Sequence, residues 1–147
     1  KGYYTSEDAR LTMNSRLDEI HASILRYKLK SVDKLIDNRN KIANYYFNKI
    51  ELDGISFHPH KPNTVYYNFV VRHKKRDEII EYAKSKGVYF NINYPYPIHK
   101  MKGYSFLKKQ KLKNTEIFSK EIFNLPIFPS LKKSEMKKVI KVLNNFK

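Results

Sequence analysis

The pattern of apolar and polar positions predicts a long helical stretch near the start of the chain. From about Leu17 to Ile50, apolar residues recur at steps of three and four, which places them along one side of a helix. The polar patch 37–40 interrupts this stripe, so the stretch is either one bent helix or two helices that meet near the patch. Ser15 and Asp18 have the spacing of a capping box, which predicts the helix start. The apolar stripe requires a partner surface.

The middle of the chain shows the shorter period of strands. Residues 55–58 and 65–72 are rich in β-branched and aromatic side chains, which predicts two strands on either side of a proline-containing loop. Residues 76–86 have a helical pattern that ends at Gly87, as a helix with a glycine C-cap would. Residues 88–93 return to alternation and predict another strand.

Two further helices are predicted in the last third of the chain. Residues 115–123 predict a short helix, which leads into the stiff extended piece 125–129 with its two prolines. Ser134 predicts the N-cap of a final helix. The residues expected on the buried side of that helix are Met136, Val139, Ile140, Val142 and Leu143.

These elements predict an α+β fold in which a long N-terminal helix is followed by a small sheet with flanking helices. The 147 residues suffice for one domain with its own core. We divide the chain into a linker at 1–16, a long helix at 17–50 and a small α+β domain at 51–147.

Composition narrows the classes of function. Thirty Lys and Arg against fourteen Asp and Glu give a net charge of +16, which attracts anionic partners. The lysines are spread along the whole chain, so we interpret them mainly as a solvated surface and expect no nucleic-acid partner. The absence of cysteine excludes disulfides and thiolate metal sites, and the five histidines show no metal-binding spacing. No apolar run is long enough to span a membrane, and a cytoplasmic location is expected.

Two separated motifs resemble those of one enzyme family. The segment 14–20, Asn-Ser-Arg-Leu-Asp-Glu-Ile, is followed by Ala22, Leu25 and Lys28-Leu29, and it resembles N-R-L/M-x-E-I-Q-A-A-x-L-x-x-K-L of the DegT/DnrJ/EryC1/StrS pyridoxal-phosphate-dependent sugar aminotransferases. The segment 94–99, Tyr-Pro-Tyr-Pro-Ile-His, resembles the H-Y-P-x-P-x-H loop of the same family. The resemblance covers most of this chain but only the C-terminal part of such an enzyme.

The resemblance implies the C-terminal small domain of a fold-type-I transferase. The whole enzyme would move an amino group from glutamate to a nucleotide-linked keto-sugar, using pyridoxal 5'-phosphate in a homodimer. The long helix would pack against the large domain or the other subunit. The chain begins at Lys1, not at Met, and is too short for a complete member, so we expect it to be an excised or truncated piece.

The resemblance also places the cofactor-bearing lysine N-terminal to the segment where this chain begins. None of the lysines here sits in a matching context, so we expect no catalytic residue in this chain and no transamination by the chain alone. Three positions depart from the family pattern: Thr12 replaces a Gly, His21 replaces a Gln, and Asn93 replaces the first His of the loop. These changes weaken the transfer of individual contacts more than the family assignment.

Asn14 and Arg16 are the candidate cofactor-binding residues. A short polar side chain beside a helix N-terminus lies where free N–H groups and the helix dipole favour an anion, although from the sequence alone an ordinary helix cap is the favoured interpretation. The resemblance implies that Asn14 reaches the phosphate of the neighbouring subunit's cofactor. Arg16 could bind a phosphate or carboxylate bidentately, or pair with Glu19 or Glu7 on the surface.

Tyr94 and His99 are the candidate substrate-binding residues. Two prolines stiffen their loop, which fixes a side chain well enough to hydrogen-bond a sugar hydroxyl or a phosphate, although a lone loop histidine is usually only solvated. The resemblance implies that both residues lie near the substrate of the partner subunit's active site. Asp18 and Glu19, in contrast, are interpreted as cap and dipole residues of the first helical turn, not as acid/base groups.

A rival hypothesis is a basic, aromatic-rich module that binds nucleic acid or a scaffold. Its support is the net charge, the aromatic segment 66–69 on a predicted strand and the basic run 108–111. No RNP, KH or zinc-finger pattern accompanies them. Steeply salt-dependent oligonucleotide binding would favour this rival, and dependence on cofactor or nucleotide-sugar would favour the enzyme.

Overall fold

The computed structural model describes residues 17–59, 64–104 and 111–147. The chain divides into two compact units, residues 1–33 and 34–147, and each unit is described by itself. The predicted linker at 1–16, together with Asn14 and Arg16, lies outside the described residues.

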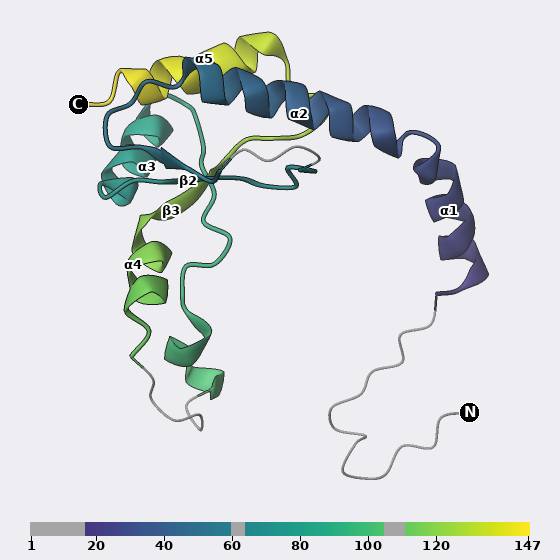
Figure 1. Cartoon of the computed structure of the whole chain (residues 1–147), viewed down its shortest axis with the longest axis horizontal. Helices are drawn as coiled ribbons and strands as arrows, with labels where there is room; N and C mark the ends of the chain where they lie inside the picture. Colours follow the sequence, from purple (N-terminus) through teal and green to yellow (C-terminus); the bar gives the residue numbers. More distant parts are fainter. Residues whose placement is uncertain (1–16, 60–63, 105–110) are drawn as a thin grey trace. The chain divides into compact units, whose positions relative to one another are not determined.

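The described part of the first unit is centred on helix α1, Glu19–Leu29 (Figure 1). Asp18 is its N-cap, and a carboxylate oxygen accepts a 2.8 Å hydrogen bond from the backbone N–H of His21. This bond is the main reason why the pKa of Asp18 is lowered. The interpretation of Asp18 as a cap residue is confirmed: α1 begins at Glu19, directly after it, and Ser15, the other residue of the predicted capping box, lies outside the described residues.

The predicted helical stretch 17–50 consists of two helices and is not one bent helix. The second helix, α2, is Val32–Lys49. The break lies at Lys30 and Ser31, not near the polar patch 37–40, which is wholly inside α2. The backbone N–H of Ser31 donates to the carbonyl of Lys28 at 3.1 Å, and so does the Ser31 hydroxyl at 3.1 Å. These bonds between residues three apart tighten the end of α1 and close it.

The apolar stripe changes character along its length. Helix α1 contains no buried residue. The exposed members of the stripe are Leu17, Ile20, Ile24, Leu25, Leu29, Val32 and Leu35. The buried members are Ile42, Ala43, Tyr46 and Ile50. The first half therefore presents apolar surface to solvent, and its packing against a large domain or second subunit stays a prediction.

The second unit is built on a three-stranded antiparallel sheet in the order β1-β2-β3. Its strands are β1 (Ser56–Phe57), β2 (Phe69–Arg72) and β3 (Ile122–Leu125). Among the described residues, the helices that follow α2 are α3 (Arg76–Ser85), α4 (Lys113–Glu121) and α5 (Lys133–Asn144), and the short 3-10 helices η2 (Ile98–Lys100) and η3 (Lys102–Tyr104) lie between α3 and α4. The predicted α+β class is confirmed.

Three of the predicted strand and helix boundaries need correction. β2 begins at Phe69 and not at residue 65, because Tyr66 has a positive φ of 47° that is incompatible with a strand. Residues 88–93 form a single antiparallel bridge, Asn91 to Asn124, and not a strand. The helix predicted at 115–123 ends at Glu121, because Ile122 and Phe123 pair with β2 as part of β3.

The prediction for the final helix is confirmed in its buried face but wrong in its cap. Val139, Ile140, Val142 and Leu143 are buried, and Met136 is partly buried. The N-cap is Lys132, whose backbone N–H donates to the Glu135 carboxylate at 2.7 Å, so Ser134 lies inside the first turn. The predicted glycine C-cap of α3 is present, since Gly87 has a φ of +67°.

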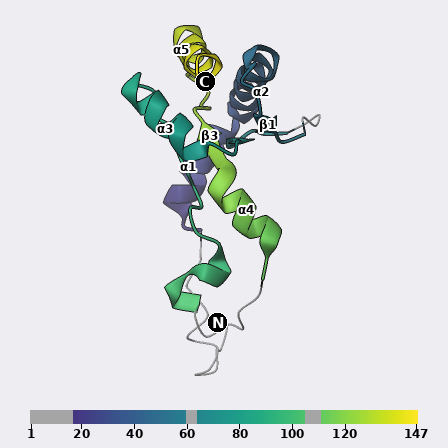
Figure 2. The same ribbon diagram turned by 90° about the vertical axis from the view of Figure 1, so that its left-hand side faces the viewer.

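Helices α2 and α5 lie side by side over one face of the sheet, and α4 extends away in the opposite direction (Figures 1 and 2). Asn144 links the ends of α2 and α5: its amide donates to the Lys49 carbonyl at 3.0 Å and accepts from the Glu51 N–H at 2.9 Å. The shared face of the two helices and the sheet encloses the core.

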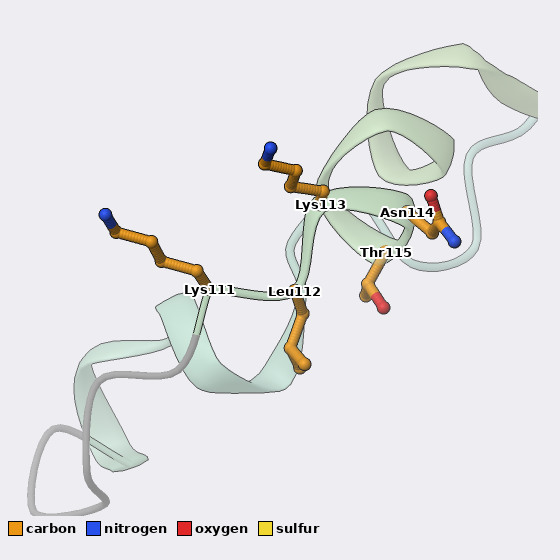
Figure 3. Close-up of a pocket in the computed structure, with 5 residues that line it drawn as sticks. All are labelled: Lys111, Leu112, Lys113, Asn114 and Thr115. Atoms are coloured by element: carbon orange, nitrogen blue, oxygen red, sulfur yellow. The ribbon is translucent and has the colours of Figure 1, made fainter.

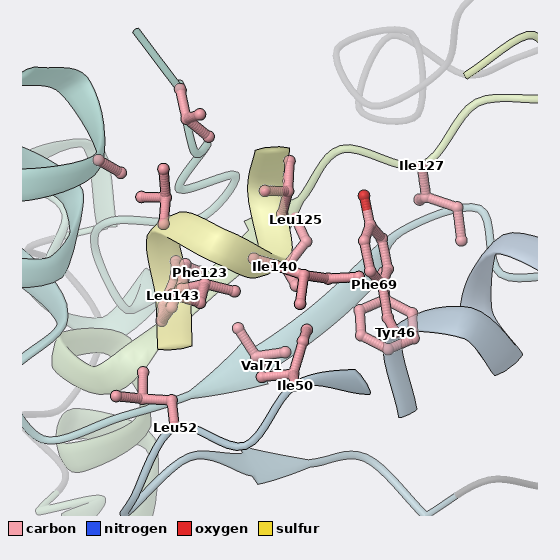
Figure 4. Packing of buried hydrophobic residues seen from close by; sticks show 14 of the residues in the cluster. Tyr46, Ile50, Leu52, Phe69, Val71, Phe123, Leu125, Ile127, Ile140 and Leu143 are labelled. Carbon is pink, nitrogen blue, oxygen red and sulfur yellow. The ribbon is translucent and has the colours of Figure 1, made fainter. Parts of the chain in front are cut away.

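Alternate residues of β2 and β3 point into that core (Figure 4). Phe69 and Val71 of β2 and Phe123 and Leu125 of β3 are almost fully buried. Tyr46 of α2 is also fully buried; its hydroxyl donates to the Pro126 carbonyl at 2.9 Å, and burial raises its pKa. The hydroxyl is therefore satisfied inside an otherwise apolar cluster.

Gly54 lies in the turn before β1, and a substitution there tests how tightly this turn is packed against the His73 ring. Replacing Gly54 with Ala should destabilise the chain by about 1–2 kcal/mol, because its φ is +74° and a Cβ would lie 3.1 Å from Nε2 of the His73 ring. His73 cannot retreat easily, since Nε2 also bonds the Asp53 carbonyl at 3.0 Å. Urea unfolding measures the change.

Gly103 provides the matched control for that substitution. A Cβ at Gly103 would meet no atom within 4 Å among the described residues, and no positive φ is required there. Gly103→Ala should therefore stay within about 0.5 kcal/mol of the unaltered chain. Equal losses for the two variants would contradict the explanation.

Candidate functional site

The loop that carries Tyr94 and His99 leaves the core after Ile92 and contains the two short helices η2 and η3. Its backbone hydrogen bonds are local: the N–H of Lys100 donates to the Pro97 carbonyl at 2.9 Å, and that of Met101 donates to the Ile98 carbonyl at 3.0 Å. These bonds shape the loop but do not attach it to the sheet. Side-chain contacts join it to a helix.

Glu116, in the first turns of α4, supplies such contacts. One carboxylate oxygen lies 3.2 Å from Nε2 of His99, and the other lies 3.2 Å from the ammonium of Lys100. Only 12% of the His99 side chain is exposed, against 33% for Glu116. The hydrogen bond with His99, followed by that with Lys100, lowers the pKa of Glu116. The cluster of His99, Lys100 and Glu116 thus joins the loop to a helix.

Helix α4 is itself anchored to the sheet at its other end. Arg72 of β2 forms an ion pair with Glu121 and stacks over the Phe118 ring, with its guanidinium carbon 4.6 Å from the ring centroid. Arg76, at the start of α3, donates to the backbone carbonyl of Ser119. These contacts fix α4, and α4 in turn carries Glu116 to the loop.

The predicted site residues have different surroundings in the structure. Tyr94 is 73% exposed, whereas His99 is largely enclosed and paired with Glu116. Asn14 and Arg16 lie outside the described residues, and their role stays a prediction. The sequence reasoning missed Glu116. No local pattern pointed to it, since it lies seventeen positions after His99 on a different element.

A hollow of about 480 Å³ lies at the start of α4, lined by residues 111–115 (Figure 3). Lys111 and Lys113 extend from it into solvent, and Leu112, Asn114 and Thr115 complete the lining. No charged side chain is buried among these five residues, so they form a surface depression and not a built ligand site.

We tested the described residues for a pyridoxal-phosphate site. A lysine that forms a Schiff base needs a desolvated pocket or a neighbouring cation that lowers its pKa. Every lysine that the structure describes is exposed. The described lysines therefore lack the enclosed surroundings in which a Schiff-base lysine is activated.

The described residues contain neither a metal-binding cluster nor a membrane-spanning helix. Within residues 17–59, 64–104 and 111–147, no group of three or more His, Asp and Glu side chains is arranged to hold a metal ion. Among the described helices, none is both long and apolar enough to cross a bilayer.

The aromatic segment invoked for a nucleic-acid module is largely part of the core. Tyr66 and Phe69 are buried, and only Tyr67 of the three rings is strongly exposed. A stacking surface requires several accessible rings in a row. Residues 108–110 of the basic run lie outside the described part of the chain.

The fold is that of the C-terminal small domain of sugar aminotransferases. The chain superimposes on S. venezuelae DesV with a TM-score of 0.83 and 30% sequence identity, covering 90% of this chain and 37% of DesV. It is 36% identical over 139 residues to a dTDP-3-amino-3,4,6-trideoxy-alpha-D-glucose transaminase of Micromonospora megalomicea subsp. nigra, covering 88% of this chain and 37% of that enzyme.

A second relative gives the same coverage. The dTDP-3-amino-3,6-dideoxy-alpha-D-galactopyranose transaminase of Aneurinibacillus thermoaerophilus is 34% identical over 140 residues, covering 91% of this chain and 38% of that enzyme. The model of the DegT/DnrJ/EryC1/StrS aminotransferase family matches residues 1–144. This chain belongs to that family, and it spans a little over a third of the length of these relatives. The family resemblance seen in the two motifs is confirmed.

Proposed function

We propose that this chain is the C-terminal portion of a pyridoxal-phosphate-dependent aminotransferase that transfers an amino group to a nucleotide-linked keto-sugar. The match to the aminotransferase family over residues 1–144 carries this proposal. The names of the two transaminase relatives, both of which act on dTDP-linked sugars, support the class of substrate. Glutamate as the amino donor, a homodimeric assembly and a cytoplasmic location belong to the same proposal.

Four residues of this chain have roles in the proposal. Asn14 and Arg16 would hold the cofactor phosphate, with Asn14 reaching across the dimer. Tyr94 and His99 would contact the sugar substrate. The exposed ring of Tyr94 and the fixed imidazole of His99 suit this role, because one can adapt to a ligand and the other is already oriented.

The cofactor-bearing lysine would lie outside this chain. The exposure of every described lysine supports that part of the proposal. Accordingly, the chain alone would not transaminate, and the complete protein would be required.

The test uses the protein expressed from its complete gene. We expect an absorbance band of bound pyridoxal phosphate that glutamate bleaches and a nucleotide-linked keto-sugar restores. The 147-residue chain alone should show no such band. If the complete protein binds no cofactor, or if glutamate leaves the band unchanged, the aminotransferase proposal fails.

A further inference from the structure

The contact between Glu116 and His99 determines where the imidazole carries its proton. An ionised carboxylate can only accept hydrogen bonds, and the cationic and imidazole neighbours of Glu116 keep it ionised. With the carboxylate oxygen 3.2 Å away, Nε2 of His99 must therefore be the donor.

The second ring nitrogen of His99, Nδ1, differs from Nε2 in its contacts. In the described part of the chain, Nδ1 of His99 makes no hydrogen bond, and it is not among the buried polar atoms without a partner. The His99 side chain as a whole is 12% exposed. In the neutral imidazole with its proton on Nε2, Nδ1 is an acceptor.

Glu116 is held more firmly than the loop that it contacts. Its helix is attached to the sheet through Arg72 and Arg76, whereas the loop's own backbone bonds are local. Lys100, which belongs to the same loop as His99, lies 3.2 Å from the other carboxylate oxygen, so both oxygens contact the loop. The orientation of His99 is thus set by α4.

We propose that Glu116 is a positioning residue, which holds the proton of His99 on Nε2 and leaves Nδ1 as the acceptor for a hydroxyl group of the sugar. This inference rests on the proposed function, since the sugar is a ligand only if the protein is a sugar aminotransferase. Glu116 itself does not touch the ligand. It acts through the imidazole.

The first test detects the hydrogen bond without any reaction. The complete protein is labelled with ¹⁵N-histidine, and the His99 ring signals are identified by their loss in His99→Asn. The Nε2–H proton should be observable, because a hydrogen bond slows its exchange with water. In Glu116→Gln this signal should broaden or vanish, because a neutral amide is a weaker partner than a carboxylate and can also donate.

Glu121 offers a matched control at the other end of the same helix. Glu121→Gln makes the same change of charge at nearly constant volume and does not contact His99; its amide oxygen can still accept a hydrogen bond from Arg72, so α4 should stay attached to the sheet. The Nε2–H signal should persist in this variant. A His99 signal that is absent from the unaltered protein, or that Glu116→Gln leaves intact, would overturn the positioning role.

The second test separates the two halves of the reaction. Glu116→Gln should lower kcat/KM for the nucleotide-linked sugar by up to about a hundredfold while bleaching of the cofactor band by glutamate is much less affected. A merely structural role would slow both halves together, which would contradict the proposal. Glu121→Gln should change neither half selectively.

Failure of the proposed function would appear in the reaction of the unaltered protein, and not in the comparison of the variants. If the unaltered protein transfers no amino group to any nucleotide-linked sugar, the ligand assigned to Nδ1 is wrong, whatever the ring signal does. If the sugar reacts normally in Glu116→Gln, the aminotransferase stands and the positioning role falls.

Discussion

Replacing Phe123 with Ala will lower the free energy of unfolding by about 3–5 kcal/mol. Phe123 is fully buried at 0% exposure in β3, and its ring lies 5.4 Å from that of Phe90, centroid to centroid. The substitution removes apolar contacts and leaves a cavity between the sheet and its helices, which the surrounding structure can fill only in part. Urea denaturation, followed by far-UV circular dichroism, measures the loss.

Phe128 is the control for this substitution, since it is the same residue type, only a few positions along the chain, and 43% exposed. Phe128→Ala should cost about 1 kcal/mol or less, because it leaves no enclosed cavity. If Phe123→Ala also costs less than about 1 kcal/mol, the sheet does not form the centre of the core. Should Phe123→Ala prevent folding, Phe123→Leu provides a smaller step with the same sign.

The buried face of each long helix could be read from the sequence. In α5 the spacing of Val139, Ile140, Val142 and Leu143 identified the residues that contact the sheet, because a helix repeats its environment every 3.6 residues. The same period identified Ile42 and Tyr46 of α2. Periodicity reports which side of an element is apolar, and this side is what the core requires.

The strands were harder to predict from the periodicity of the sequence. β3 has only four residues, and its first two continue the apolar pattern of the preceding helix. What makes Ile122 and Phe123 a strand is their pairing with Arg72 and Val71, which lie some fifty positions earlier in the chain. No local pattern contains that information, because such pairing is decided by tertiary contacts.

Some residues of the candidate site could likewise be predicted from the sequence, and others could not. The proline-stiffened loop and its motif predicted Tyr94 and His99 as substrate-binding residues, because the residues that form the motif are neighbours in the sequence. Glu116 lies seventeen positions after His99, on a different element, and only the docking of α4 brings the two together. A partner contributed by a distant element leaves no spacing to recognise.

The polar patch 37–40 shows the same limit, since the sequence predicted that one helix bends or two helices meet there. In the structure, Arg39 lies within α2, and its guanidinium reaches across to other segments. One terminal nitrogen lies 3.1 Å from the Tyr66 carbonyl, 3.0 Å from that of Tyr67 and 3.3 Å from that of Ile127. A polar residue that appears to interrupt the apolar stripe is therefore a link between α2, the segment before β2 and the segment after β3.

Replacing Arg39 with Met should cost about 2–3 kcal/mol, because three carbonyls lose a charged donor. One of them belongs to Tyr66, whose φ of 47° must be held by such contacts. Arg39→Lys should recover less than half of the loss, since a single ammonium does not reproduce the planar guanidinium. Arg26→Met, on the exposed surface of α1, is the control and should change stability by about 0.5 kcal/mol or less. Thermal and urea unfolding of the four proteins measure these differences, and full recovery by Lys would show that charge alone, without the geometry of the guanidinium, stabilises this junction.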